Sequence, residues 1–328
     1  MDAAEAASYD ERPGTAPYDD CGSRRQYVGI HVRHYLGLLL VPLLAILAVR
    51  DAANLLAPRW LADGHEAWVL LPALGLLLLG FPVLLRYTWL TRPLEPGPLR
   101  IRLERLAAKA GFPMRDILVW RTDGMICNAA VAGILPPLRY VFLTDALLER
   151  LDEPEIEAVF AHEVAHVRLH HLLWRVLAMA APVSLWLMAR HAFPDISDWA
   201  FGDLSTDSVT AGLVAVAALA FYLFCVFGYY SRMLEHQADL LGCRLLTKLP
   251  SDDSRPIFQV ALEKLATANG TRRTVRGWQH ASIARRTSFL ERIWHDPEEG
   301  AAFGRRLRWL SGLLVAVVLS PVVCKLVL

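Results

Sequence analysis

Five long apolar runs alternate with polar segments along the chain. The runs cover His34–Val49, Trp68–Leu90, Leu172–Ala189, Val209–Tyr230 and Trp309–Leu328. A helix of about 20 apolar residues is long enough to cross the hydrocarbon core of a bilayer, so each run is a candidate membrane span. For the first two runs the alternative is a pair of buried soluble helices. The third run is short and contains Arg175, so its alternative is a steeply placed or partly inserted helix.

The polar segment after the second run predicts a small α+β unit. Arg100–Gly111 is amphipathic and basic, and Gly111 is a typical helix terminator. Thr144 is a favourable cap for a short helix that would run to Leu151. Short β-strands are expected at Ile117–Trp120, Cys127–Gly133 and Tyr140–Leu143. The fold class is therefore mainly α, with multi-span membrane helices and a small α+β domain whose short sheet lies beside the next helix.

That next helix, expected at Asp152–His171, carries the most informative polar residues. Its acidic first turn favours helix initiation, and His162, Glu163 and His166 form an HExxH motif. Residues four apart share a helix face, so both imidazoles can bind one ion. Glu163 is rotated by about 100° and can reach a water on that ion. Imidazoles suit zinc, and the alternative is a chance motif whose histidines are solvated or satisfied in a core.

A second acidic segment directly follows the fourth apolar run. Glu235 and Asp239 are four residues apart, so their carboxylates share a helix face. One carboxylate can bind the ion, and the other can accept the second ring N–H of a ligand histidine. A solvated acidic face is the alternative. His236 is expected to point elsewhere.

Three blocks of this chain resemble the HtpX-like and CAAX-type family of integral-membrane zinc metallopeptidases. They are Asn128–Gly133, the HExxH helix and Ser231–Asp239, and the similarity extends over roughly Leu103–Leu290. In that family the second acidic motif supplies the third metal ligand. A further family block, HPSxxxR, is matched by His280–Arg285, with Ala281 in place of proline.

The resemblance implies a zinc metalloendopeptidase of the zincin type, with one Zn²⁺ per chain and polypeptide substrates. His162, His166 and Glu235 would be the metal ligands, and Asp239 would orient a ligand histidine from behind. Glu163 would take a proton from the attacking water and return it to the leaving amine. Further candidates for transition-state or substrate contacts are Arg232, His280, Asn128 and Ala129. A structural role is the alternative for each of them.

Composition and charge suggest where such a site lies. The chain has 328 residues, of which 55% are hydrophobic, with mean hydropathy +0.32 and net charge +1. The near-zero charge gives no reason to expect a nucleic-acid partner, and five scattered cysteines predict neither a disulfide frame nor a zinc knuckle. Residues 92–121 carry seven Lys/Arg and residues 191–208 carry none. The positive-inside rule then places the N-terminus and the active site in the cytoplasm, in what we expect to be a bacterial plasma membrane.

These patterns divide the chain into six segments. We expect a disordered tail at 1–27, a transmembrane hairpin at 28–91, the first half of a metalloprotease domain at 92–171, two membrane helices with an acidic outer loop at 172–230, the second half of the domain at 231–307 and a fifth transmembrane helix at 308–328. The expected partners are membrane lipid and membrane-protein substrates.

Other classes of protein remain as alternatives. A one-shot membrane sensor-transducer with a metalloprotease domain would need a ligand-binding domain outside the membrane, and the acidic loop is short for that purpose. A catalytically inactive scaffold would not need Glu163 together with a full ligand set. A zinc exporter would place its ligands within the spans instead of beside them.

Overall fold

A computed structural model of the chain describes residues 24–60, 65–192, 209–247, 254–275, 277–278 and 281–327. Most of the expected N-terminal tail, most of the expected acidic loop and His280 lie outside these ranges. The chain folds as two compact units. The first comprises Met1–Arg100, Pro113–Asp152 and Lys264–Thr271, and the second comprises Ile101–Phe112, Glu153–Glu263 and Arg272–Leu328.

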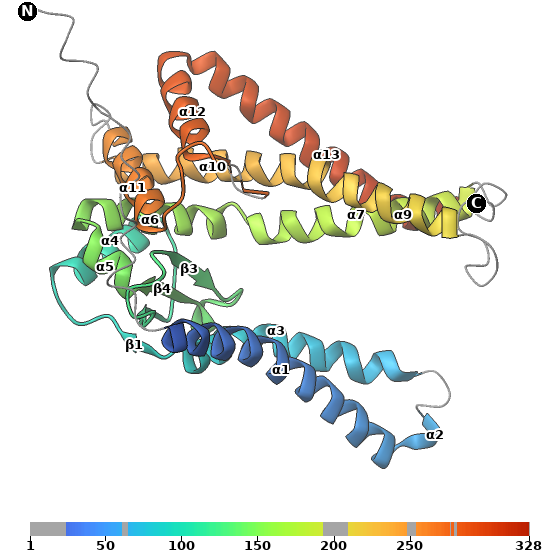
Figure 1. The fold of residues 1–328 in the computed structure, drawn as a ribbon. Coiled ribbons are helices and arrows are strands. Elements are labelled where there is room, and N and C mark those ends of the chain that lie inside the picture. The colour runs from blue at the N-terminus through green and yellow to red at the C-terminus, as the bar shows by residue number, and fades with distance from the viewer. Residues whose placement is uncertain are drawn as a thin grey trace, which may run out of the picture. The chain divides into compact units, whose positions relative to one another are not determined.

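The first unit begins with a helical hairpin. Helix α1 (Arg24–Leu56) and helix α3 (Glu66–Thr88) lie side by side and are joined through the short α2 (Pro58–Trp60), as Figure 1 shows. Both contain a segment long and apolar enough to cross a membrane. The two helices are therefore paired as expected, and their crossing of a membrane stays a prediction. The connection between them is shorter than expected because α1 continues past the end of the apolar run to Leu56.

A four-stranded sheet follows the hairpin. Its strands are β1 (Thr91–Pro93), β2 (Asp116–Trp120), β3 (Ala129–Ala132) and β4 (Tyr140–Thr144). The spatial order is β1-β2-β4-β3, with β2 and β4 parallel and the outer pairs antiparallel. The three predicted strands are confirmed. Strand β1 was not predicted, because three residues that include a proline carry no alternating pattern.

One face of this sheet packs against α3. The apolar cluster there contains Leu85 from α3 and Leu118, Trp120, Tyr140 and Phe142 from the strands. Trp89 follows α3 and stacks on Trp120 with ring centroids 3.8 Å apart. The sheet therefore rests directly on the end of a candidate membrane helix.

The turn after β3 depends on Gly133. Its φ is +121°, and a Cβ there would lie 2.4 Å from the carbonyl oxygen of Leu138. We therefore expect Gly133→Ala to destabilise the protein by about 2 kcal/mol, through backbone strain and the clash. Thermal unfolding of the purified protein in detergent measures this effect. Gly97→Ala is the control, because a Cβ at Gly97 meets nothing within 4 Å; equal losses in both variants would contradict the prediction.

The second unit is helical. Its elements are α4 (Pro98–Lys109, from Ile101), α6 (Glu153–Arg168), α7 (His171–Ala192), α9 (Val209–Phe221), the π-helical η3 (Tyr222–Phe227), α10 (Gly228–Leu246), α11 (Arg255–Ala268, as far as Glu263), α12 (Ile283–His295) and α13 (Pro297–Val327). Helices α9, η3 and α10 form one uninterrupted helical run (Figure 1). Three further candidate spans lie in this unit, which makes five among the described residues.

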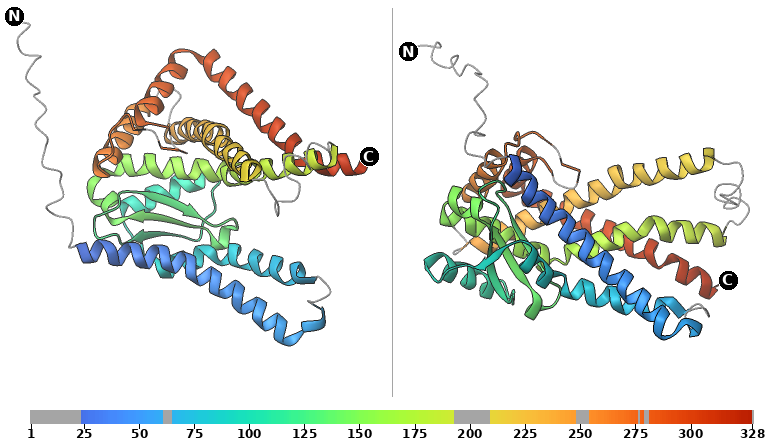
Figure 2. Two further views of the ribbon diagram at one scale, coloured as in Figure 1. Left: turned by 45° about the vertical axis from the view of Figure 1, so that its right-hand side comes forward. Right: turned by 60° about the horizontal axis from the view of Figure 1, so that its bottom comes forward.

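An apolar cluster holds the candidate membrane helices of this unit together. It joins Ala178 of α7, Tyr230 and Leu234 of α10 and Leu307 of α13. The Tyr222 hydroxyl also donates to the backbone carbonyl of Ala178 over 2.6 Å. Helix α6 packs along α10, and both lie close to α7 in the two views of Figure 2. The HExxH helix is thereby fixed against the helix that carries Glu235.

Candidate metal centre

Helix α6 presents the HExxH residues because its other face is buried. Ile156, Phe160 and Val164 recur at four-residue steps, which places them on one helix face, and they are at most 2% exposed. The acidic first turn is held by Arg102, whose Nη1 lies 3.0 Å from Glu153 Oε2. With the apolar side packed, His162 and His166 face α10.

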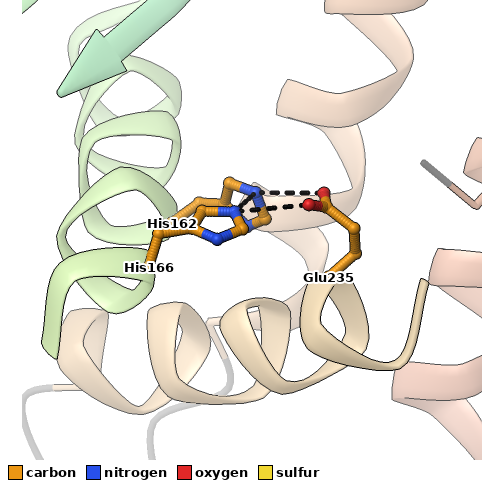
Figure 3. A group of neighbouring side chains, drawn as sticks. All are labelled: His162, His166 and Glu235. Atoms are coloured by element: carbon orange, nitrogen blue, oxygen red, sulfur yellow. Dashed lines mark hydrogen bonds and ion pairs between the residues drawn. The ribbon is translucent and has the colours of Figure 1, made fainter. Parts of the chain in front are cut away.

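His162, His166 and Glu235 converge on one point, as Figure 3 shows. The Nε2 atoms of the two histidines are 3.1 Å apart, and Glu235 carboxylate oxygens lie 3.7 Å from His162 Nε2 and 3.5 Å from His166 Nε2. Two ligand atoms of a tetrahedral zinc site with bonds of about 2.05 Å are about 3.3 Å apart. The donor set and its spacing therefore fit zinc, and the half-buried Glu163 lies next to His162 on the same turn.

Close approach of α6 and α10 depends on Gly242. A Cβ at this position would lie 3.0 Å from Phe258 Cε2 and 3.3 Å from the backbone nitrogen of His162. We expect Gly242→Leu to cost about 1–3 kcal/mol through overpacking and to weaken zinc binding, because α10 must move away from α6. Thermal unfolding and chelator competition measure the two effects. Gly212→Leu is the control in the same helical run: a Cβ there meets nothing within 4 Å, so stability and zinc binding should both stay unchanged. Unaltered zinc binding by Gly242→Leu would contradict the prediction.

Asp239 holds His162 from behind the metal position. Its Oδ1 lies 3.0 Å from His162 Nδ1, and its side chain is fully buried. The buried Arg286 pairs with the same carboxylate, its Nε donating to Oδ2 over 2.8 Å and its Nη2 to Oδ1. Sequence reasoning placed Asp239 in this position but missed Arg286. The arginine at the spacing of the HPSxxxR block is the buried Arg286, one residue beyond the expected Arg285, which is exposed.

Burial and neighbouring charges set the protonation of the two histidines. Burial and the Arg286 charge lower the pKa of His162, but its hydrogen bonds to Asp239 and Glu235 outweigh them and raise it to about 9. Burial, aided by the His162 charge, holds the pKa of His166 well below its usual value. Because a ligand imidazole must be unprotonated at the atom that binds the metal, a cation would replace the proton that His162 otherwise holds near neutral pH.

Two residues of α7 reach the ligands and were not predicted to do so. His171 contacts His166, and Arg175 contacts Glu235. Each left a signal in the sequence. His171 lies five residues after His166, and Arg175 is a charged residue within an apolar run, which by itself indicates a polar partner.

The other predicted residues are not members of the ligand group, and His280 lies outside the described residues. Arg232 Nη1 donates to the backbone carbonyl of Trp278 over 2.9 Å, and the His236 ring packs on Phe289. Asn128 and Ala129 belong to the first compact unit, at the start of β3. Catalytic roles for Arg232, Asn128, Ala129 and His280 stay predictions.

Known proteins with similar sequences are proteases. A protease HtpX homolog from Pyrococcus abyssi is 28% identical over 155 residues, which cover 47% of this chain and 53% of the relative. A CAAX prenyl protease 1 homolog from Oryza sativa is 26% identical over 216 residues, covering 61% of this chain and 48% of the relative. The chain thus spans about half the length of these curated relatives.

The fold and a family model agree with these similarities. The crystal structure of S. mikatae Ste24p matches 82% of this chain and 66% of that chain, with a TM-score of 0.55 and 18% identity, which is a likeness of fold alone. The model of peptidase family M48 matches residues 93–287, more than half of the chain. That range includes the HExxH helix, Glu235 and Asp239. The chain therefore belongs to peptidase family M48, a family of metalloproteases.

Proposed function

We propose that this M48 protein is a membrane-embedded, zinc-dependent endopeptidase that hydrolyses peptide bonds of membrane or membrane-associated proteins. The observation that carries the proposal is the triangle of His162, His166 and Glu235, whose ligand atoms all lie within 4.8 Å of one another. Two imidazoles and one carboxylate with a fourth position left for water are the ligand set of a catalytic zinc site. A purely structural zinc site would use four protein ligands.

The chain's own residues have distinct parts in the proposed reaction. A zinc ion bound there would act as a Lewis acid and lower the pKa of a coordinated water toward neutrality. Glu163 accepts a proton from the attacking water as its oxygen adds to the carbonyl carbon of the substrate. It returns that proton to the amine nitrogen as the C–N bond breaks. His162 and His166 fix the place of the reaction through their rigid positions on α6.

The position of the site along the chain indicates the substrate class. Helix α6 ends at Arg168, and the candidate span in α7 begins at His171. The candidate span Gly212–Leu246 is longer than a bilayer requires, and its apolar run ends at Tyr230, five residues before Glu235. A site joined to two spans lies at or near the membrane surface. Substrates are then membrane proteins, their loose ends or lipid-anchored peptides, and the function is quality control or processing. The relatives named CAAX prenyl proteases support the lipid-anchored class.

The orientation rests on charge. Residues 92–121 carry seven Lys/Arg. Because basic residues close to spans are retained in the cytoplasm, the metal centre faces the cytoplasm, in a bacterial plasma membrane as expected above.

The experiment that tests the function combines metal analysis with cleavage assays on the full chain in detergent. We expect about one zinc per chain, loss of casein or membrane-protein cleavage after chelation, and recovery when zinc is added back. Protein that cleaves equally well after complete metal removal would rule out the proposed reaction. Protein that binds zinc but cleaves none of these substrates in detergent or in liposomes would instead favour the inactive scaffold.

A further inference from the structure

We propose that one face of the membrane helix α7 positions the metal ligands from outside, with His171 holding His166 and Arg175 holding Glu235. This inference rests on the proposed metal centre. It gives a positioning role to two residues that do not bind the metal themselves. His171 and Arg175 are four residues apart, one turn of α7, so they project from the same helix face. Helix α7 thereby contacts two of the three ligands.

The contact between His171 and His166 fixes the hydrogen positions on both rings. Their Nδ1 atoms are 2.8 Å apart, and the Nε2 atom of His171 is 3.1 Å from Gln237 Oε1. If His166 binds metal through Nε2, its Nδ1 carries the hydrogen and donates to His171 Nδ1. His171 must then carry its own hydrogen on Nε2, where Gln237 Oε1 accepts it. Each donor meets an acceptor, and His171 is only 1% exposed, so the chain of hydrogen bonds is shielded from water.

A tight turn brings His171 back toward the ligand. Helix α6 ends at Arg168, and His170 has a φ of +55°. The left-handed conformation costs about 1 kcal/mol for a residue other than glycine. It ends one helix and starts the next within two residues, so the His171 ring lies 4.8 Å from the His166 ring, nearly perpendicular to it. With a longer loop, or with one continuous helix, the side chain at position 171 would not point back toward His166.

Arg175 acts on the third ligand. Its Nη2 donates to Glu235 Oε1 over 2.7 Å, and the Glu235 side chain is 1% exposed. A carboxylate that is buried so completely needs hydrogen-bond donors to hold one orientation. The guanidinium therefore holds the Glu235 carboxylate in the orientation in which its oxygens face the two histidines. Charge-assisted bonds of this kind are shorter and stronger than neutral ones.

The two ligand histidines thus depend on different elements. His162 is backed by the Asp239 carboxylate of α10 and by Arg286 of α12, whereas His166 is backed by a neutral imidazole of α7. Outer partners of this kind typically contribute about 10–100-fold to metal affinity. Because α7 is a candidate span, displacement of this helix would alter the geometry of two ligands at once.

The test measures zinc affinity of the full chain in detergent by competition with a chromophoric chelator. For His171 we compare Leu, which removes the acceptor, with Asn, whose side-chain oxygen takes the place of Nδ1. We expect His171→Leu to bind zinc about 10–100-fold more weakly and His171→Asn to stay within about threefold of the parent. His170→Asn is the matched control, since asparagine tolerates the left-handed conformation. Its affinity should equal that of the parent.

For Arg175 the comparison is between Leu and Lys. Arg175→Leu should weaken zinc binding by about tenfold, and Arg175→Lys should restore most of it, because the ammonium can still donate to Glu235. Equal loss in His171→Leu and His171→Asn would show a packing role and overturn the His171 assignment. Tighter zinc binding in Arg175→Leu would show that the guanidinium only repels the cation, and would overturn the Arg175 assignment.

These outcomes are separable from failure of the proposed function. If the unaltered chain binds no zinc, the metal centre itself is wrong and with it the inference. If the unaltered chain binds zinc and cleaves substrate, but His171→Leu and Arg175→Leu bind zinc as the parent does, only the inference on α7 falls. Thermal unfolding of each variant identifies any that fail to fold. If a Leu variant does not fold, the zinc affinity of the conservative variant at that position, His171→Asn or Arg175→Lys, is compared with that of the parent.

Discussion

Replacing Glu163 with Gln is expected to lower the rate of peptide-bond hydrolysis by about a thousandfold while zinc stays bound. The carboxylate is the only change, and the amide that replaces it has nearly the same shape. Glutamine cannot accept a proton from water at neutral pH, so both proton transfers are lost. The three ligands are untouched, because Glu163 lies one position along α6 from His162 and is not in the ligand group.

The measurement is cleavage of casein or a membrane protein by purified protein in detergent, with zinc content determined on the same sample. Glu153→Gln is the matched control: the same substitution on the same helix, at a residue that pairs with Arg102 in the first turn. We expect this control to keep activity near that of the parent. Unchanged turnover in Glu163→Gln would remove Glu163 from the mechanism and leave the metal centre in place.

The local features of this fold could be read from the sequence. His162 and His166 were predicted to face one ion from their four-residue spacing, and the ring nitrogens are 3.1 Å apart. Thr144 was predicted to cap a short helix running to Leu151, and its hydroxyl accepts a hydrogen bond from the Leu147 backbone nitrogen. Such features depend on neighbouring residues alone. They need no knowledge of how distant segments pack.

The partners of the ligands are different, because they come from far along the chain. Arg286 meets His162 from 124 residues away, and Arg175 meets Glu235 from 60 residues away. No periodicity encodes such pairs. The resemblance to known metallopeptidases supplied the choice of Glu235 over Asp239 as ligand, and spacing alone left both open. Strand β1 was missed for a related reason, since a three-residue strand is specified by its pairing with β2.

Loss of the Arg286 side chain is expected to be among the most damaging single changes to stability. In zinc-loaded Arg286→Leu protein the fully buried Asp239 carboxylate loses its cation, because a metal-bound imidazole of His162, its remaining partner among the described residues, is neutral. Leaving one member of a buried ion pair uncompensated costs about 3–5 kcal/mol. Thermal unfolding in detergent should show a large fall in stability. Arg285→Leu is the control, because that neighbouring side chain is exposed.

The double variant Arg286→Leu/Asp239→Leu separates the two tasks of this pair. With both charges gone the buried site is apolar, so most of the lost stability should return. Zinc affinity should stay low, because the Nδ1 hydrogen of His162 then has no carboxylate to hold the ring in place. A double variant that recovers stability and zinc affinity together would show that Asp239 serves only to neutralise Arg286. Recovery of stability without affinity would show that the buried carboxylate is retained for the metal centre, at a cost in stability that Arg286 offsets.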